Sequence, residues 1–247
     1  MITNSDSGTN VHEIAAGIYR INTPVVLPDG SEAFNFNQYL VADDEPLLFH
    51  TGPRRMFPLV SEAIGAILPV GRLRYIGFSH VEADECGALN QLLAAAPNAV
   101  PVCSRVAAMV SVDDLSDRPA RALADGEILR LGRHEMRWYD TPHLPHGWET
   151  GLMMDVHTGT LLCGDLFTQG GRGEIPLTED DILAPSEAFR GQMDYYAHAP
   201  ATAALLERLA QDRPRVLACM HGSAWQGEGA TLLRQLARSL TAQERVP

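Results

Sequence analysis

The stretch HVEADECG, residues 80–87, places one histidine and three carboxylates within six positions. It follows an apolar run of the kind that forms a buried strand. Burying unpaired charges is costly, so a positive partner is expected among these side chains. Residues at i, i+2 and i+4 share one face of an extended chain, and His80, Glu82 and Asp84 have that spacing. We therefore expect an extended segment that presents metal ligands, ahead of a helix that begins near Gly87.

Further donors stand at or just past the ends of other expected strands, where α/β proteins commonly assemble their sites. His146 is favoured over its neighbour His143, which is expected to line the pocket, and Asp165 and His221 follow two later strands. Three histidines with three or four carboxylates suit two metal ions bridged by a carboxylate. The candidate metal ligands are His80, Glu82, Asp84, Glu85, His146, Asp165 and His221.

The types of these ligands discriminate between metals. Zinc sites are built mostly from imidazole and thiolate groups, whereas a mixture of imidazole and hard oxygen ligands also suits iron or manganese. Anionic oxygens stabilise the higher charge of ferric iron. We therefore expect two iron ions as cofactors, with zinc or manganese as the alternatives.

Composition excludes several other classes of function. The 247 residues carry 19 basic against 31 acidic side chains, a formal net charge of −12, which argues against nucleic acid and anionic membranes as partners. The sequence contains no lysine, so Schiff-base chemistry and a P-loop are excluded. The four cysteines form no CxxC motif, and the N-terminus has no signal peptide, so a cytoplasmic location is expected.

Strands and helices alternate along the chain, which predicts one α/β domain over residues 1–247 in which sheets pack together with helices outside. Residues 1–12 are expected to be a flexible N-terminal segment, and residues 170–185 an irregular loop. Strands are expected at 17–22, 34–42, 46–50, 73–79, 100–103, 127–131, 135–139, 151–156, 160–164 and 215–220. Helices are expected at 54–67, 88–95, 186–211, where Ser186 would be the N-cap, and 228–240.

The order of these motifs resembles that of the metallo-β-lactamase superfamily, and more narrowly that of the flavodiiron proteins and their short, oxygen-binding diiron relatives. Hydrolases of the superfamily carry HxHxDH, whereas the diiron branch carries HxExD, as residues 80–84 do here. Glu82 is the specific mark of that branch. His146 matches the next ligand histidine, the step Gly164-Asp165 matches a bridging aspartate, and His221-Gly222 matches the terminal motif.

The resemblance implies a four-layer αβ/βα sandwich (α/β, or α+β, in class) with the metals in a groove at one edge of the two sheets. It assigns His80, Glu82 and His146 to one iron. Asp84 and His221 would hold the other iron, with Asp165 bridging. The resemblance also suggests a homodimer.

Catalytic residues are not identified by the sequence, although three candidates stand out. Tyr195 and Tyr196 resemble paired tyrosines in the corresponding helix of diiron relatives, where a hydroxyl would lie near bound dioxygen, and His143 is the third. A core role for the two tyrosines is the alternative.

This sequence also departs from the family pattern. Glu85 stands where many flavodiiron proteins have histidine, and it is the weakest of the ligand assignments. His50 stands where the superfamily usually has aspartate, and it either bonds a ligand carboxylate, which we favour, or only ends a strand. No flavodoxin-like domain follows, so no FMN is expected in this chain. A separate flavoprotein or rubredoxin-type protein would then donate electrons.

Two functions follow from these observations. The favoured one is a non-haem diiron protein that binds, or also reduces, dioxygen or nitric oxide, either as a sensor or carrier or with a separate electron donor. As an enzyme it would be an oxidoreductase of the flavodiiron type. The alternative is a dinuclear zinc hydrolase acting on an ester, thioester or lactone through a metal-bound hydroxide. Glu82 argues against the hydrolase, because an added anion weakens the metals as Lewis acids.

Overall fold

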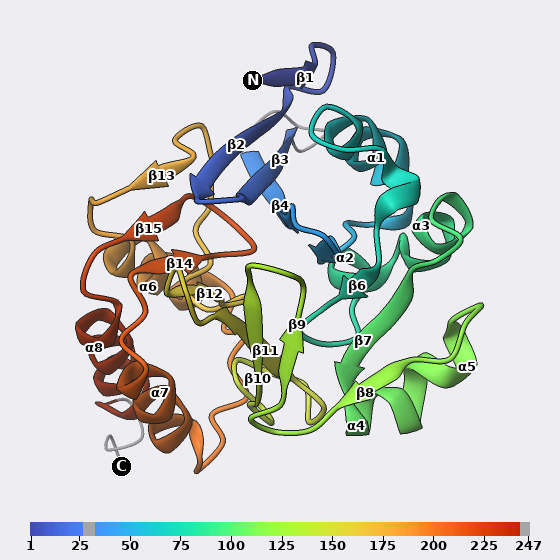
Figure 1. Ribbon diagram of the computed structural model, residues 1–247. Helices are drawn as coiled ribbons and strands as arrows, with labels where there is room; N and C mark the ends of the chain where they lie inside the picture. The colour runs from blue at the N-terminus through green and yellow to red at the C-terminus, as the bar shows by residue number, and fades with distance from the viewer. Residues whose placement is uncertain (27–32, 243–247) are drawn as a thin grey trace.

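A computed structural model describes residues 1–26 and 33–242 of the chain. Its strands form one sheet in the order β1 to β8, and a second in the order β13-β15-β14-β12-β11-β10-β9 (Figure 1). The first sheet contains β1 (Ile2–Asn4), β2 (Thr9–Ala15), β3 (Ile18–Val26), β4 (Ala33–Val41), β5 (Leu47–Phe49), β6 (Tyr75–Gly77), β7 (Val100–Ser104) and β8 (Arg121–Leu123). The second contains β9 (Ile128–Arg130), β10 (Glu135–Asp140), β11 (Gly151–Asp155), β12 (Thr160–Leu162), β13 (Leu177–Thr178), β14 (Val216–Ala218) and β15 (Ala224–Gln226).

Helices lie on the outer faces of both sheets (Figure 1). The helices that connect strands of the first sheet are η1 (Arg54–Met56), α1 (Phe57–Gly65), η2 (Val70–Arg72), α2 (Ala83–Cys86), α3 (Leu89–Ala95), α4 (Arg105–Ala107), the π-helical turn η3 (Ala108–Val112) and α5 (Asp113–Leu115). Those of the second sheet are α6 (Leu183–Gln192), α7 (Thr202–Gln211) and α8 (Gly229–Ala242). None of the helices within the described residues is long and apolar enough to cross a membrane.

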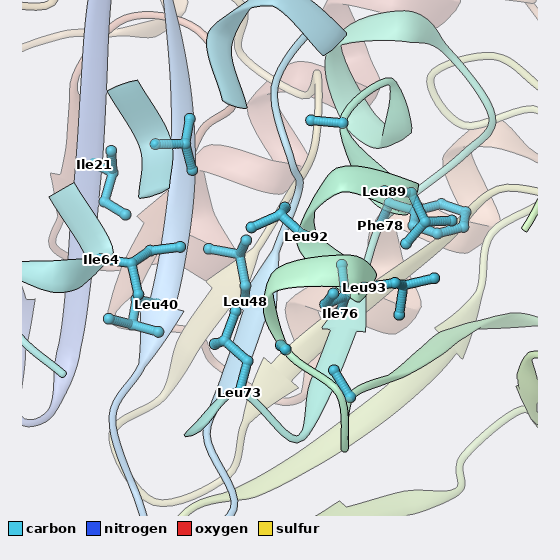
Figure 2. Packing of buried hydrophobic residues seen from close by; sticks show 14 of the residues in the cluster. Ile21, Leu40, Leu48, Ile64, Leu73, Ile76, Phe78, Leu89, Leu92 and Leu93 are labelled. Carbon is cyan, nitrogen blue, oxygen red and sulfur yellow. The ribbon is translucent and has the colours of Figure 1, made fainter. Parts of the chain in front are cut away.

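The alternation of side chains along each strand builds the four layers. On β5, Leu48 packs with the core beneath α1 and α3, whereas Leu47 and Phe49 face the core between the two sheets. Figure 2 shows the first of these cores, in which Leu48 lies with Leu40 of β4, Leu92 of α3 and Leu73. On β12, Leu161 faces α7 and α8 in the same way. Two buried faces on each sheet require helices outside both, which confirms the expected αβ/βα sandwich.

The ends of the strands that carry the candidate ligands meet at one edge of the sandwich. Strands β5, β6 and β7 run parallel, as do β12 and β14 in the other sheet, so each set leaves its following loops at a shared edge. The two edges are joined directly, because the backbone N–H of Asn37 on β4 donates to the carbonyl of Met220 just after β14, at 2.9 Å.

Three expected elements differ in the structure. The N-terminal segment contains strands β1 and β2, because Val11 and Ile14 enter the cores of the first sheet. The expected 186–211 helix is two helices, α6 and α7, because Met193, directly after α6, has extended backbone angles of φ −136° and ψ 93°. Asp181, not Ser186, accepts the first N–H groups of α6. The expected 170–185 loop contains β13 and the start of α6, and residues 27–32 and 243–247 of the expected 1–247 domain lie outside the described residues.

Candidate metal centre

The helix of the HVEADECG stretch begins earlier than expected. Glu82 is extended, and the single turn of α2 starts at Ala83 rather than near Gly87. Carboxylates are favourable in the first turn of a helix, which is where Asp84 and Glu85 lie. Because the backbone turns at this point, Glu82 and Asp84 face two different groups of donors instead of sharing one.

The first group consists of His80, Glu82 and His146, whose candidate ligand atoms all lie within 4.8 Å of one another. The Nε2 atoms of the two histidines are 2.9 Å apart. Glu82 places Oε1 at 3.4 Å from Nε2 of His146 and Oε2 at 3.8 Å from Nε2 of His80. Three donor atoms therefore converge on one point.

The second group consists of Asp84, Glu85 and His221, and it meets the same criterion. Nε2 of His221 lies 3.4 Å from Oδ2 of Asp84. Glu85 is fully buried and also contributes an oxygen at 3.9 Å from Nε2 of His80. The second group is thus richer in carboxylate than the first.

Asp165 lies between the two groups. Its Oδ2 is 3.6 Å from Nε2 of both His80 and His146, and its Oδ1 is 3.3 Å from Nε2 of His221. One carboxylate therefore turns a different oxygen to each group. The structure brings all seven candidate ligands together, although metal binding by them stays a prediction.

Electrostatics in this cluster depends on how each carboxylate is surrounded. Hydrogen bonds with His146 and His80 lower the pKa of Glu82 to about 2. Burial opposes ionisation of Asp165, but the histidines around it, His221 above all, hold its pKa well below the usual range. Burial also disfavours a charged His221, yet Asp165 and Asp84 raise its pKa to about 10. The carboxylates therefore attract positive charge into the cluster.

Glu85 tests whether the residues fit a metal. Burial, followed by repulsion from Asp165 and Asp84, raises the pKa of Glu85 well above the usual range. Neither of its oxygens has a hydrogen-bond partner among the described residues. Buried polar atoms are normally hydrogen-bonded, so these orphaned oxygens indicate a missing cation. Two ions, one in each group, would satisfy them, and the donor set fits that metal content.

Each of the three candidate ligand histidines also makes a contact through its other ring nitrogen, Nδ1. Nδ1 of His146 lies 2.8 Å from the carbonyl oxygen of Tyr195, and Nδ1 of His221 lies 2.8 Å from that of Asn35. Nδ1 of His80 instead lies 2.9 Å from Oγ of Ser79. These contacts turn all three Nε2 atoms toward the cluster, as metal-ligand histidines require.

A buried polar network that the sequence analysis missed holds the loop of His221. The carbonyl of Gly222 accepts hydrogen bonds from Arg20 and Asn37 at 2.8 Å each, and its N–H donates to Oδ1 of Asn35 at 2.7 Å. The strand sequence FNFN contains the signal, since alternate positions of a strand face opposite sides. Its phenylalanine side includes Phe34, which stacks on the ring of His221 with centroids 4.3 Å apart.

The other residues singled out in the sequence lie outside the cluster of seven candidate ligands. His143 is exposed and has no contact with the cluster among the described residues. The ring of Tyr195 lies edge-on to His146 with centroids 6.3 Å apart, and burial raises the pKa of its hydroxyl to about 12. Tyr196 is buried behind it, at 4.7 Å between centroids. His50 was expected to bond a ligand carboxylate. Its Nε2 instead contacts the hydroxyl of Ser79 at 3.0 Å, because the ring points toward β6.

Two cavities reach the cluster from outside. One, of about 690 Å³, has mostly apolar walls that include Phe78 and Leu89, and Glu82 lies on its surface. The other, of about 610 Å³, is lined by Phe34 and Phe36 and reaches Asp84. Each cavity therefore borders one carboxylate of the cluster, Glu82 in the first and Asp84 in the second.

Comparisons with known proteins identify the family of this chain. A sequence model of the family described as ODP family beta lactamase matches residues 34–222. The chain is 26% identical over 196 residues to the putative diflavin flavoprotein A 1 of Nostoc sp. (strain PCC 7120), which covers 77% of this chain and 34% of that protein. It is 27% identical over 203 residues to the rubredoxin-oxygen oxidoreductase of Megalodesulfovibrio gigas, which covers 78% of this chain and 49% of that protein. The chain thus spans half or less of the length of these relatives.

Structural comparison supports the fold independently. The rubredoxin oxygen:oxidoreductase from Desulfovibrio gigas superposes on this chain with a TM-score of 0.81 at 22% sequence identity. The match covers 96% of this chain and 62% of that chain. The two proteins therefore share the four-layer sandwich described above.

Proposed function

The chain belongs to the ODP family beta lactamase, in the flavodiiron branch of the metallo-β-lactamase superfamily, and from this we propose that it holds two iron ions and binds dioxygen or nitric oxide there. The observation that carries the proposal is the placement of Asp165. Its two oxygens face two separate groups of donors, as a carboxylate that bridges two ions must. The hard-oxygen content of both groups favours iron.

Different residues of this chain would hold each of the two ions. Two bound ferrous ions would supply the electrons for binding or reducing the diatomic ligand. His80, Glu82 and His146 would hold one ion, and Asp84 and His221 the other, with Asp165 between them. We add Glu85 to the second ion, because its buried oxygens have no other partner among the described residues. His80 and His221 are almost completely buried, so the protein keeps bulk water from their side of the site.

The tyrosine pair and the electron supply are further parts of the proposal. Tyr195, half-buried beside His146, is the tyrosine that we place nearest the bound ligand. A separate flavoprotein or rubredoxin-type protein would provide electrons for turnover, as the name of the rubredoxin-oxygen oxidoreductase suggests for that relative. A homodimer is expected from the family. The four cysteines are free thiols, which fits a reducing compartment such as the cytoplasm.

Metal analysis of protein purified without oxygen tests the diiron proposal. We expect about two iron ions per chain, and a new visible absorption when the ferrous protein is exposed to dioxygen or nitric oxide. The Asp165→Asn variant is the matched comparison, since it keeps the size of the side chain but removes the bridging charge, and it should hold less iron. A wild-type content of one metal ion or fewer per chain contradicts the proposal.

The zinc hydrolase alternative is tested in the same preparation. Glu82 lies against both histidines of the first group, where hydrolases of the superfamily have a neutral imidazole. Its negative charge would weaken a bound zinc ion as a Lewis acid. Hydrolysis of an ester, thioester or lactone by zinc-loaded but not iron-loaded protein would replace the oxygen-binding function with the hydrolytic one.

A further inference from the structure

The hydrogen-bond partner of His80 distinguishes it from the other two ligand histidines. His146 and His221 direct Nδ1 at backbone carbonyls, which can only accept a hydrogen bond. His80 directs Nδ1 at the hydroxyl of Ser79. A hydroxyl both donates and accepts, so the proton position on His80 depends on what Ser79 contacts next.

The next contact fixes the direction of the whole chain of hydrogen bonds. Nε2 of His50 lies 3.0 Å from Oγ of Ser79 and 3.4 Å from the backbone nitrogen of the same residue. A backbone N–H can only donate, so Nε2 of His50 must be an unprotonated acceptor. The Ser79 hydroxyl therefore donates its single proton to His50. It is left to accept from His80, whose proton must be on Nδ1.

Two features make the observed conformation of His50 energetically unfavourable. It is 1% exposed, and its backbone φ is +67°, in the left-handed region that side chains other than glycine seldom adopt. Its Nδ1, which carries the proton of the neutral ring, has no hydrogen-bond partner among the described residues. Strain and an orphaned buried donor persist where the surroundings impose them, and they cluster at functional sites.

The backbone around His50 explains how this conformation is imposed. The N–H of His50 donates to the carbonyl of Gly77 on β6 at 2.8 Å, and the next N–H, that of Thr51, donates to the carbonyl of Glu85 at 2.7 Å. These two bonds tie the end of β5 to β6, just before the HVEADECG stretch, and to the stretch itself. The left-handed turn at His50 aims its ring at Ser79.

We propose that Ser79 and His50 are positioning residues that form a directed, uncharged relay behind His80, and that this relay sets the metal affinity and the reduction potential of the diiron site. The proposal rests on the proposed function, since it concerns metal bound to Nε2 of His80. The relay holds the proton of His80 on Nδ1, so that Nε2 presents its lone pair to the cluster. The terminal acceptor, His50, is a neutral imidazole. Through Ser79 it therefore polarises the Nδ1–H bond of His80 less than a carboxylate would.

The charge of the terminal acceptor has a consequence with a definite sign. An anionic acceptor makes a ligand histidine more basic and stabilises the ferric state. A missing acceptor makes it less basic and favours the ferrous state. The reduction potential should therefore rise in Ser79→Ala and fall in His50→Asp, with the wild type between them.

The experiment compares these variants by metal titration and redox titration. Aspartate tolerates the left-handed backbone, so His50→Asp changes the charge without adding strain, and His50→Asn is its uncharged control. We expect Ser79→Ala to lose roughly 10–100-fold in zinc affinity. Ser239→Ala removes a hydroxyl on α8 that donates to Glu187, and it should change neither affinity nor potential. Equal potentials in all variants, or shifts of the same sign in Ser79→Ala and His50→Asp, overturn the relay.

A nitrogen NMR measurement on metal-free protein separates this proposal from the proposed function. Free histidine prefers its neutral proton on Nε2, whereas the relay requires it on Nδ1 in both His50 and His80. A His50 ring protonated on Nε2 overturns the relay even if the protein binds two iron ions. Wild-type protein that binds no metal overturns the proposed function, and the His50 and His80 tautomers then decide whether the relay exists.

Discussion

Glu85 and Asp165 are neighbouring carboxylates whose surroundings differ sharply. Asp165 has three histidine nitrogens within 3.6 Å, so its negative charge is compensated within the protein. Glu85 has one histidine nitrogen, at 3.9 Å, and it faces two other carboxylates. An uncompensated buried charge is among the most costly features of a folded chain. We therefore expect a bound cation to offset the free-energy cost of burying the charge of Glu85.

The substitution Glu85→Gln is expected to separate the folding role of this residue from its metal role. Glutamine has the same size and no charge, so the melting temperature of metal-free protein should stay the same or rise. The affinity for the second metal should fall at least about tenfold, which is ~1.4 kcal/mol. Differential scanning calorimetry with and without iron measures both effects. Glu62→Gln, at an exposed position of α1, is the control, and a lower metal-free melting temperature in Glu85→Gln would contradict this account.

Strand β11 connects the core between the sheets to the loops that carry the candidate metal ligands. It pairs with β10, where Trp138 is fully buried between the two sheets. Gly151, its first residue, donates its N–H to the carbonyl of Ser79 at 2.9 Å. A Cβ added at Gly151 would lie 2.0 Å from the ring of Trp138. The close approach of this glycine therefore permits both the packing of the tryptophan and the support of Ser79.

The substitution Gly151→Ala should weaken both the packing of Trp138 and the support of Ser79. Forcing an extra carbon into a packed core costs about 1–3 kcal/mol, so we expect a lower free energy of unfolding in urea. Metal affinity should fall with it, because the Ser79 carbonyl loses its support. Gly65→Ala in α1 is the control: its Cβ would meet no atom within 4 Å, and alanine there should add ~0.5–1 kcal/mol of stability. Equal stability of the two variants would refute the packing argument.

The candidate metal centre draws its ligands from both halves of the sandwich. His80, Glu82, Asp84 and Glu85 follow β6 of the first sheet, whereas His146, Asp165 and His221 lie in loops of the second. The two sheets already share an apolar core. At the edge where that core ends, carboxylates and imidazoles from opposite sheets come within 4 Å of each other. Metal ions bound there would join the two halves of the molecule.

Metal binding is therefore expected to stabilise loops of both sheets together. At a free metal concentration of 100 times Kd, the gain in the free energy of unfolding should be about 2.7 kcal/mol. Hydrogen exchange should slow on iron addition in residues 79–86, 143–150, 164–169 and 219–223 at once. In Asp165→Asn the protection of the two sheets should no longer change in parallel. Protection confined to one sheet in the wild type would show that the ions do not join the halves.

The sequence by itself determined the features that depend on local spacing. The apolar patterns predicted most strands and one α/β domain with helices outside its sheets. The resemblance carried by HxExD, Asp165, His146 and His221 implied the αβ/βα sandwich and which side chains the fold collects at one edge. The family match confirms the resemblance that those residues indicated. Metal binding by the seven candidate ligands stays a prediction.

Only the tertiary structure decided what holds those side chains in place. The contact of His50 with Ser79 joins two different strands, and the carbonyl of Tyr195 is available to His146 because the expected helix breaks between α6 and α7. Asn35 contacts Gly222, which lies 187 residues further along the chain. Local periodicity records which face a residue occupies, but a hydrogen bond between distant segments depends on the packing of complete layers, which no short stretch of sequence contains.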